Sequence, residues 1–267
     1  MEGVQDMNKI PESDQMEIVT LTPENIMEYG FCGYKDANKH KEMLRKADWY
    51  KKYYSRGLRI NVLMSQKDGS QGMIEYIPGE YAHRPVVAEN YMFIHCLFVG
   101  YKKEFKEQGY GSRLIESCRK EAEKLGKDGV AVVSRKGSFM AKREIFVKNG
   151  FSIMGQKKPD FELLGIKFKA TQNTPRFIEE TSDKYGNGLF ILRSPQCPYT
   201  EKNVQAMVET AEELGLNPKV VDLSGHEAAQ ANPSPFGTFA LIYNGEVLSH
   251  HPISNTRFQN IMKKVSA

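Results

Sequence analysis

The sequence predicts an α/β protein of the α+β kind, with a mixed sheet flanked by helices and a second, smaller α/β domain. Strand patterns, some alternating and others nearly all apolar, precede and follow an amphipathic helix in the sequence. This helix comes directly after a glycine cluster at 109–111. A polar stretch then precedes a new set of strands and helices. We expect four segments: an extension at 1–15, a domain at 16–170, a linker at 171–187 and a domain at 188–267.

The composition excludes several classes of protein. The 267 residues carry a net charge of +4, with Lys and Arg spread among Glu, so nucleic acid is not an expected partner. The longest apolar runs, such as 92–99, are too short to span a bilayer, and the polar start shows no signal peptide. The four cysteines form no CxxC pair and no ligand spacing with the six histidines, so we expect no metal. These features predict a reduced, cytoplasmic protein with no membrane partner.

The elements of the first domain follow from periodicity and turn residues. Residues 16–21 alternate as a strand, and Thr22-Pro23-Glu24-Asn25 is a typical helix start. Lys67-Asp68-Gly69 predicts a hairpin turn. The other expected elements are a helix over 36–55, strands at 58–66, 72–77, 91–99 and 129–134, a helix over 138–149, and strands from 151 and over 161–168.

The second domain is predicted to have the order β-α-β followed by β-β-α. A strand at 188–194 precedes a helix with an apolar stripe, for which Thr200 is the expected N-cap. A strand at 219–223 and a hairpin around Asn244-Gly245 follow, and residues 254–265 form the last helix.

The chemistry of the first domain is concentrated around Gly109-Tyr110-Gly111, between a buried strand and the amphipathic helix. A helix N-terminus exposes unpaired N–H groups and partial positive charge, and glycine lets a phosphate approach them. There is no Gly-Lys-Ser/Thr of a Walker loop and no Gly-x-Gly-x-x-Gly of a dinucleotide fold. A plain turn is the alternative interpretation. The nearby cations are Lys102, Lys103, Lys106 and Arg113.

Residues 91–115 resemble motif A of the GNAT superfamily of N-acetyltransferases, where Arg/Gln-x-x-Gly-x-Gly/Ala follows a strand that ends in Val. The motif here is Lys106-Glu107-Gln108-Gly109-Tyr110-Gly111, with Lys in the first position. "EIFVKNGF" (144–151) is similar to the second signature of the family. The resemblance covers residues 16–168. It implies the GNAT sheet, with a central strand splayed from its neighbour, and an acetyl-CoA-dependent N-acetyltransferase.

This resemblance also implies a binding mode and a reaction. The pyrophosphate of CoA would sit on the amides of 107–112, and the pantetheine would run beside Leu97–Val99. A strand N–H near Phe98 would polarise the thioester carbonyl, which a primary amine of a small molecule or peptide attacks directly. The implied cofactor-binding residues are Leu97, Phe98, Val99, Lys106, Glu107, Gln108, Gly109, Tyr110, Gly111, Ser112, Arg113 and Phe146.

Proton transfer is the part of the reaction that the motifs do not assign. Many relatives use a Tyr as the acid at the position of Phe146. His95 and Glu75, on adjacent central strands, are candidate bases, although a slip of one residue would turn either to the other face. A hydrogen-bonded core histidine and a salt-bridged carboxylate are the alternatives. Candidates for an acceptor pocket, against a plain surface loop, are Tyr81, His83 and Arg84.

The second domain resembles thioredoxin-like proteins at Cys197-Pro198-Tyr199-Thr200 and in its later hairpin. Thr200 replaces the resolving cysteine, and Gly237 stands where the family usually has a cis-proline. A helix N-terminus is expected to lower the pKa of Cys197, which makes it a candidate reactive thiol. A relic scaffold or docking module is the alternative.

Together the two halves resemble YoaP-like acetyltransferases, a bacterial group. This resemblance implies that the second domain takes part in substrate recognition or in the contacts of a homodimer. Two other functions remain open from the sequence. One is a CoA-binding sensor with weak or no transferase activity, and the other is a monothiol oxidoreductase that uses Cys197.

Overall fold

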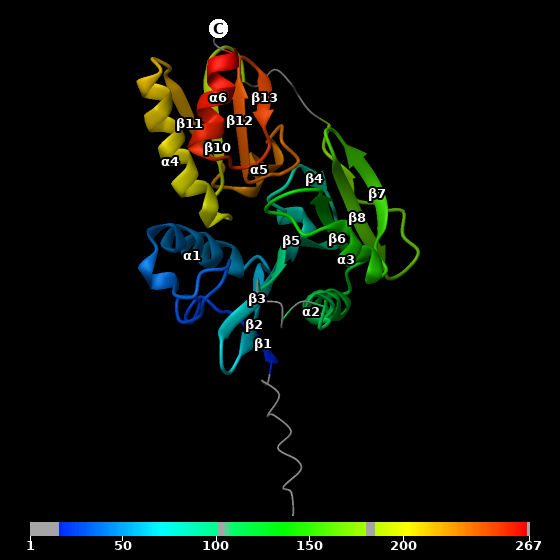
Figure 1. Ribbon diagram of the computed structural model, residues 1–267. Helices are drawn as coiled ribbons and strands as arrows, with labels where there is room; N and C mark the ends of the chain where they lie inside the picture. The colour runs from blue at the N-terminus through cyan, green and yellow to red at the C-terminus, as the bar shows by residue number, and fades with distance from the viewer. Residues whose placement is uncertain (1–15, 101–104, 106, 180–184, 266–267) are drawn as a thin grey trace, which may run out of the picture.

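The computed structural model describes residues 16–100, 105, 107–179 and 185–265 (Figure 1). The predicted extension at 1–15 lies outside the described residues, and so do three of the cations expected near the phosphate site: Lys102, Lys103 and Lys106. Among the helices that are described, none combines the length and the apolar character that a membrane-spanning segment needs.

A seven-stranded mixed sheet forms the first part of the chain, which confirms the predicted fold class. Its strand order is β1-β2-β3-β5-β6-β8-β7, and every neighbouring pair is antiparallel except β5 and β6. The central strands carry nearly continuous apolar sequence because both of their faces are covered. The strands are β1 (Met16–Thr20), β2 (Arg59–Ser65), β3 (Gly69–Pro78), β5 (Tyr91–Val99), β6 (Gly129–Arg135), β7 (Ser152–Lys157) and β8 (Phe161–Lys167).

Helices cover the two faces of this sheet unequally. On one face, α2 (Tyr110–Lys124) and α3 (Arg143–Lys148) pack on a core that includes Ile94 and Val132. On the opposite face, α1 (Lys41–Tyr54) packs over β2 and β3, next to the 3-10 helix η1 (Ala37–Lys39). This second face is completed by the C-terminal part of the chain (Figure 1).

The C-terminal part, here called the second unit (Leu189–Val265), has a four-stranded sheet in the order β11-β10-β12-β13. Strands β10 and β11 are parallel, and the other two pairs are antiparallel. The predicted β-α-β and β-β-α order is present, with the short helix α5 in addition. The elements are β10 (Leu189–Arg193), α4 (Pro198–Glu213), β11 (Pro218–Asp222), α5 (His226–Gln230), β12 (Phe239–Tyr243), β13 (Glu246–Ser249) and α6 (Asn255–Val265).

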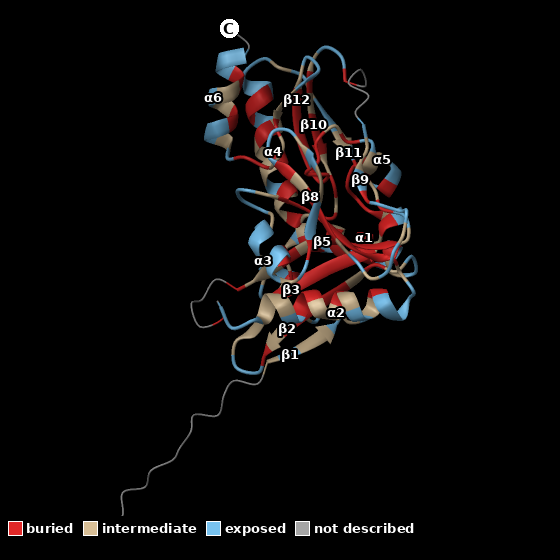
Figure 2. Cartoon of the chain, turned by 90° about the vertical axis from the view of Figure 1, so that its right-hand side faces the viewer, coloured by how far each residue is buried: buried red, intermediate tan, exposed pale blue. Residues whose placement is uncertain are grey.

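One hydrophobic core joins the second unit to the large sheet. Phe93 of β5 and Leu163 of β8 belong to the same buried cluster as Ile191 of β10 and Met207 of α4. Figure 2 shows buried residues continuing from one sheet into the other. Burial of this kind stabilises the docked arrangement at roughly 25 cal/mol per Å² of apolar surface. The second unit is therefore packed onto the sheet.

The segment expected to be a linker also makes ordered contacts. β9 (Arg176–Phe177) pairs antiparallel with β4 (Val86–Val87), in the loop that follows the 3-10 helix η2 (Gly79–Tyr81). Lys157 of β7 donates to the carbonyl of Ile178 at 2.9 Å. The stretch before the second unit thus runs along the first sheet. The division into domains stays a prediction.

Three local expectations were wrong. No helix follows Thr22: the Asn25 side chain accepts the Thr22 N–H at 2.7 Å, but residues 23–28 form successive turns before Gly30. The chain then folds back on itself, and Gly30 comes so close to the Tyr34 carbonyl that a Cβ would stand 2.4 Å from its oxygen.

The other two concern helix starts. The helix expected over 138–149 begins only at Arg143, because Phe139 has a φ of 70° and the Ser134 hydroxyl holds the Ala141 carbonyl at 2.8 Å. Helix α4 begins at Pro198 with Cys197 as N-cap, since proline presets the helical φ. The Thr200 hydroxyl lies inside the helix and donates to the Cys197 carbonyl at 2.8 Å.

Candidate active site

The large sheet opens between β5 and β6. The two strands pair only over Tyr91–Ile94 and Gly129–Val132, although both continue further. A bulge lies at this point on the other edge of β5, since Glu75 of β3 pairs with Cys96, and Tyr76 pairs with Ile94. His95 is the extra residue, and a bulge bends its strand and increases the twist. Beyond Ile94, β5 is therefore paired with β3 but with no other described strand.

The first turn of α2 lies against this opening. A Cβ on Gly111 would lie 3.8 Å from Val99 and 3.3 Å from Ile145, so glycine lets the helix start close to β5. Gly109 is the N-cap with a φ of 77°, and a Cβ there would meet no atom within 4 Å. Glu107 also has a positive φ, of 61°. Gly109 thus gives the first N–H groups of α2 no cap from its own side chain.

The predicted cofactor residues divide between the two faces of β5. Leu97 and Val99 pack toward α2, whereas Phe98 packs toward α1. The Arg113 guanidinium lies over the Tyr110 ring and donates to the Met16 carbonyl at 3.1 Å. Gln108 and Ser112 lie at the start of α2, and Ser112 accepts from Asn149 at 3.0 Å.

Phe146, whose contact with the cofactor stays a prediction, lies in the hydrophobic core. Its side chain is buried between α3 and the sheet, with its ring centroid 5.6 Å from that of Phe151. A phenyl ring also has no proton to give. Phe146 is therefore part of the hydrophobic core under α3.

A buried polar cluster lies beneath the bulge. Lys46 of α1 donates to Oε2 of Glu75 at 2.5 Å, and Oε1 of Glu75 accepts from Nδ1 of His95 at 3.2 Å. None of these three side chains is more than 1% exposed. Burial alone would raise the pKa of Glu75, but the Lys46 charge and the His95 hydrogen bond outweigh it and lower the pKa to about 2. Glu75 is therefore ionised.

His95 is held as a neutral ring. The His83 N–H donates to its Nε2 at 2.8 Å, so the ring proton must sit on Nδ1, facing Glu75. Burial lowers the pKa of His95 to about 4, against the opposing effect of Glu75. Both ring nitrogens are engaged in protein hydrogen bonds in this arrangement. The catalytic roles predicted for His95 and Glu75 stay predictions.

The second unit contributes Gln196 to this cluster. Its side-chain amide donates to Glu75 at 2.9 Å and accepts from Arg84 at 2.7 Å, and its backbone carbonyl accepts from Lys46 at 2.5 Å. Arg84 also donates to the carbonyls of His83 and His95, at 2.8 and 3.1 Å. Burial lowers the pKa of Arg84 to about 10.

Gly237 allows the second unit to approach His83 and Arg84 closely. A Cβ at this position would stand 2.5 Å from the His83 carbonyl oxygen and 2.5 Å from Cδ of Arg84. The residue also has a φ of 77°. Glycine is thus required here by the contact between the units and by the backbone conformation.

The candidate acceptor residues lie under the second unit. His83 and Arg84 are buried, and Nε2 of His83 accepts from Trp49 at 3.0 Å. Tyr81 is half-buried beside His226 of α5, with ring centroids 5.2 Å apart. The alternative of a plain surface loop is therefore wrong for His83 and Arg84. Their place as an acceptor pocket stays a prediction.

Three half-buried thiols surround the Lys46–Glu75 pair: Cys32, Cys96 and Cys197. Burial raises the pKa of Cys197, and the Lys46 charge and the helix N-terminus do not reverse this. The expected lowering of its pKa was wrong, because desolvation outweighs the helix end. In the described part of the chain, no group of three or more His, Cys, Asp or Glu side chains could hold a metal ion.

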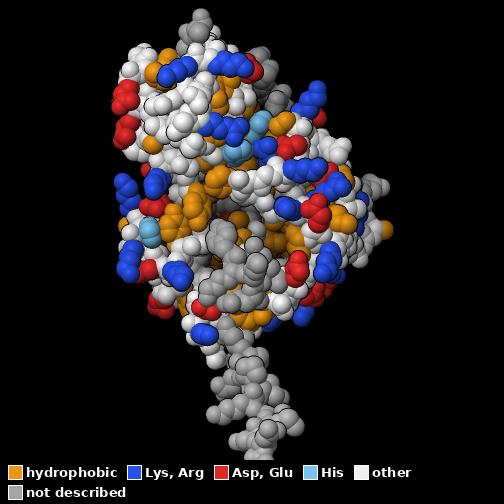
Figure 3. All heavy atoms as spheres, in the orientation of Figure 1, with side chains coloured by type: hydrophobic (Ala, Val, Ile, Leu, Met, Phe, Trp, Pro, Cys, Tyr) orange, Lys and Arg blue, Asp and Glu red, His pale blue; other side chains and the backbone are white. Residues whose placement is uncertain are grey.

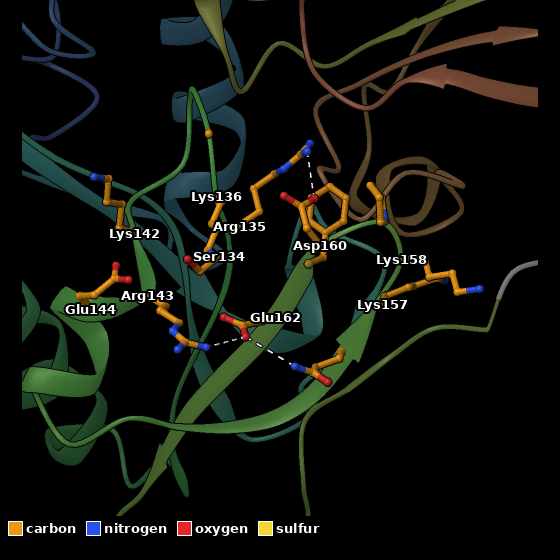
Figure 4. A pocket seen from close by; sticks show the side chains of 14 residues that line it. Ser134, Arg135, Lys136, Lys142, Arg143, Glu144, Lys157, Lys158, Asp160 and Glu162 are labelled. Atoms are coloured by element: carbon orange, nitrogen blue, oxygen red, sulfur yellow. Dashed lines mark hydrogen bonds and ion pairs between the residues drawn. The ribbon is translucent and has the colours of Figure 1, made fainter.

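A basic cavity of about 740 Å³ lies beside the opening (Figure 4). The end of β6, the start of α3 and the β7–β8 hairpin form its walls. Arg135 pairs with Asp160, and Arg143 with Glu162, each at 2.9 Å. Its charged lining residues are Arg135, Lys136, Lys142, Arg143, Glu144, Lys157, Lys158, Asp160 and Glu162. Six cations and three acids favour an anionic group in this cavity.

The molecular surface is hollowed in the same region. Figure 3 shows a hollow near the centre of the face, between the second unit and the lower part of the molecule, with hydrophobic side chains around it. Aromatic rings from both parts approach one another: Tyr34 and Tyr199 have centroids 5.3 Å apart, and Phe139 and Tyr199 6.2 Å apart. Tyr199 also donates to the Cys32 carbonyl at 2.6 Å.

Comparison with known proteins shows similarity along nearly the whole chain. An uncharacterised N-acetyltransferase, YoaP of Bacillus subtilis (strain 168), is 24% identical over 253 residues, covering 93% of this chain and 99% of the relative. The model of a family described as YoaP-like matches residues 219–260, which lie in the second unit.

Solved acetyltransferase structures are similar to part of the chain. A protein of Bacillus anthracis that is described as a streptothricin acetyltransferase by assignment, in complex with acetyl coenzyme A, matches 42% of this chain at 18% identity and a TM-score of 0.34. The chain spans 63% of that protein. The PaiA N-acetyltransferase of Thermoplasma acidophilum, in complex with coenzyme A, matches 58% of this chain and 99% of its own, at 16% identity and a TM-score of 0.41.

Two residues of the buried polar cluster, Lys46 and Gln196, were not among the predicted site residues. The sequence contains a pattern that could have indicated a buried role for Lys46. It lies between Met43 and Tyr50 on the apolar stripe of α1, where an unpaired cation would be costly. No such pattern marks Gln196, because a glutamine in a turn does not indicate which buried carboxylate it will contact.

Proposed function

We propose that this protein is an acetyl-CoA-dependent N-acetyltransferase that acetylates a primary amine of a small molecule or peptide. The observation that carries the proposal is the opening between β5 and β6, with the N-terminus of α2 and its Gly109 N-cap beside it. The similarity to an N-acetyltransferase over 93% of the chain supports it. The opening matches the splayed central strand that motif A implies.

The residues at the opening fit CoA. A pyrophosphate is doubly negative, and it would accept from the amides of 107–112 at the positive end of the helix dipole. Gly109 leaves room for it, and Gly111 keeps the helix start against Val99. The pantetheine amides would lie along the backbone of Leu97–Val99, beyond the point where β6 leaves β5. Acetyl-CoA is accordingly the acyl donor of the proposed enzyme.

Bound acetyl-CoA supplies an activated acetyl carbonyl. The amine approaches from the face that α1 and the second unit cover, toward which Cys96 and Phe98 are turned. A bond forms between the amine nitrogen and the acetyl carbon, and the bond from that carbon to sulfur breaks. Backbone N–H groups of β5 past the bulge would polarise the carbonyl. The amine must lose one proton and the leaving thiolate must gain one.

His95 is the proposed base for the amine. The ring is neutral above a pH of about 4, so it has a lone pair at neutral pH. To take a proton from the substrate amine, Nε2 of His95 must first lose the hydrogen bond that it accepts from the His83 N–H. Glu75 would then stabilise the imidazolium through Nδ1, 3.2 Å away. Phe146 offers no acid, so water or a thiol has to protonate the leaving group.

The proposal is tested with acetyl-CoA and a panel of primary amines. Release of free CoA, measured with a thiol reagent, is expected to depend on an amine, and acetyl-CoA is expected to raise the melting temperature. The proposal fails if acetyl-CoA has no effect on melting and is not consumed with any amine.

A second candidate is a CoA-binding sensor with weak or no transfer. It is favoured by the engaged nitrogens of His95 and by Phe146 in the core. Saturable CoA binding without amine-dependent CoA release would select it over the enzyme.

A thiol oxidoreductase using Cys197 is a third candidate. The strand and helix order of the second unit and the N-cap position of Cys197 support a thioredoxin-like unit. The raised pKa of Cys197 disfavours thiolate chemistry. If Cys197→Ser leaves every activity intact, this candidate is excluded.

A further inference from the structure

Gln196 connects the second unit to the polar cluster below β5. It lies in the turn before α4, and both its amide and its backbone carbonyl are buried in contacts with the first part of the chain. Gln196 is 121 residues away from Glu75 in sequence and 112 from Arg84. The side chain therefore joins a cation and an anion that belong to the other unit.

The charges of this cluster do not cancel. Lys46 and Arg84 are cations, and Glu75 is the one carboxylate among them, which leaves an excess of one positive charge. Gln196 accepts from Arg84 where a glutamate would have neutralised it. The groups that act on His95 from the surrounding elements are Lys46 of α1, Glu75 of β3, and His83 and Arg84 of the loop after η2. Cys96 of β5 and Cys197 of the second unit interact electrostatically with Lys46, Glu75 and Arg84.

This excess charge lies at the start of the open part of β5, along which acetyl transfer is proposed to build up negative charge. Arg84 donates to the His95 carbonyl at 3.1 Å, and His95 is the first residue past the parallel pairing with β6. A fixed positive field stabilises an oxyanion and a leaving thiolate, and it acts more strongly in a buried site than in water. The same field keeps the His95 ring neutral, with the lone pair that its proposed role as base requires.

We propose that Gln196 is a positioning residue through which the second unit completes the acetyl-transfer centre. Its neutral amide joins Arg84 to Glu75 and so preserves the positive charge beside the open edge of β5. This inference rests on the proposed function of the β5–β6 opening. It gives the second unit a part in the reaction in addition to its packing.

Gln196→Glu tests the proposal with a side chain of the same shape. The new carboxylate would lie about 2.9 Å from Glu75, and two carboxylates at that distance bind a proton between them or raise the pKa of a neighbouring histidine. We expect kcat to fall about tenfold or more, with the KM for acetyl-CoA within about twofold. We also expect the pKa of His95, followed by NMR of the ring, to rise by about one unit or more.

Two variants separate charge from packing. Gln205→Glu adds the same charge on the exposed side of α4 and should change neither kcat nor the pKa of His95. Gln196→Met keeps the length of the side chain without charge, and its loss of kcat should be smaller than that of Gln196→Glu. If Gln196→Glu does not fold, Gln196→Asp introduces the charge with a shorter side chain.

The outcomes are distinct. Equal losses in the Met and Glu variants, with the pKa of His95 unchanged, would overturn the proposal, because Gln196 would then only support packing. A shifted pKa of His95 with an unchanged kcat would also overturn it. If the unaltered protein transfers no acetyl group, the proposed function fails, while the NMR titration still tests the charge effect of Gln196.

Discussion

Lys46 and Glu75 form an ion pair across two elements of the first part of the chain, with Nζ and Oε2 2.5 Å apart and both side chains at most 1% exposed. The pair lies between α1 and β3, and Gln196 and His95 contact it from the second unit and from β5. Such a pair contributes little net stability compared with apolar residues, but the loss of one partner leaves a buried charge.

Removal of Lys46 alone should therefore be costly. We expect Lys46→Met to lower the free energy of unfolding by about 3–5 kcal/mol, as measured by urea denaturation. Lys41→Met, on an exposed position of the same helix, is the control and should change it by less than about 0.5 kcal/mol. The double variant Lys46→Met/Glu75→Leu should recover part of the loss. A Lys46→Met protein as stable as the control would contradict the buried pair.

Acid should destabilise the protein in two steps to which this cluster contributes. The pKa of His95 is lowered to about 4 in the fold, so unfolded chains bind a proton first, and stability falls as pH drops from about 6.5 to 4. The pKa of Glu75 is lowered to about 2, so the stability that it contributes is present above about 4.5 and is lost on the way down to 2.

Variants assign these two steps. In urea titrations at a series of pH values, His95→Gln should flatten the upper part of the profile, and Glu75→Gln the lower part. His250 also has a pKa lowered to about 4 by burial, so His250→Gln is the control that shows how much of the upper step it supplies. An upper step that is unchanged in His95→Gln would refute the neutral, buried state of His95.

Replacement of His95 by glutamine tests its proposed role as base. The amide can donate to Glu75 and accept from the His83 N–H, so the fold should persist. We expect kcat to fall about 100-fold or more, because general base catalysis contributes that much. In the unaltered protein, kcat/KM should show no acid limb from His95 until pH approaches about 4. A variant with kcat within about threefold of normal would assign the proton transfer to another group.

Gly237 gives a direct test of the contact between the two units. Gly237→Ala places a Cβ 2.5 Å from the His83 carbonyl oxygen, whereas Gly215→Ala, at a similar φ of 73°, meets nothing within 4 Å. Both variants bear the cost of a positive φ, so their difference reports the clash. We expect Gly237→Ala to be the less stable by about 1–3 kcal/mol in thermal or urea unfolding. Equal stabilities would mean that the second unit does not press on His83 and Arg84.

The sequence was most informative where a local pattern decides the structure. The apolar run at 91–99 and the glycines at 109 and 111 were sufficient to predict a central strand followed by a helix that begins at the glycine cluster. The Asn244-Gly245 turn likewise predicted the hairpin of β12 and β13. In each of these cases, residues that are neighbours in the chain determine the local conformation.

The features that escaped prediction depend on distant contacts. Gln196 meets Glu75 only because the second unit docks on the sheet, and no local pattern encodes that meeting. The raised pKa of Cys197 has the same origin, since the docking buries a helix end that would be exposed in isolation. The short α3 results from a strained loop around Phe139, which a helical periodicity cannot reveal.

Binding of acetyl-CoA to two glycine variants of α2 tests the central claim most directly. Gly109 and Gly126 stand at opposite ends of this helix, both with positive φ and with no atom within 4 Å of a Cβ. By isothermal titration calorimetry, Gly109→Glu should weaken acetyl-CoA binding at least about tenfold, because it puts bulk and negative charge at the pyrophosphate site. Gly126→Glu should bind as the unaltered protein does. Equal affinity in both variants would contradict a CoA site at the N-terminus of α2.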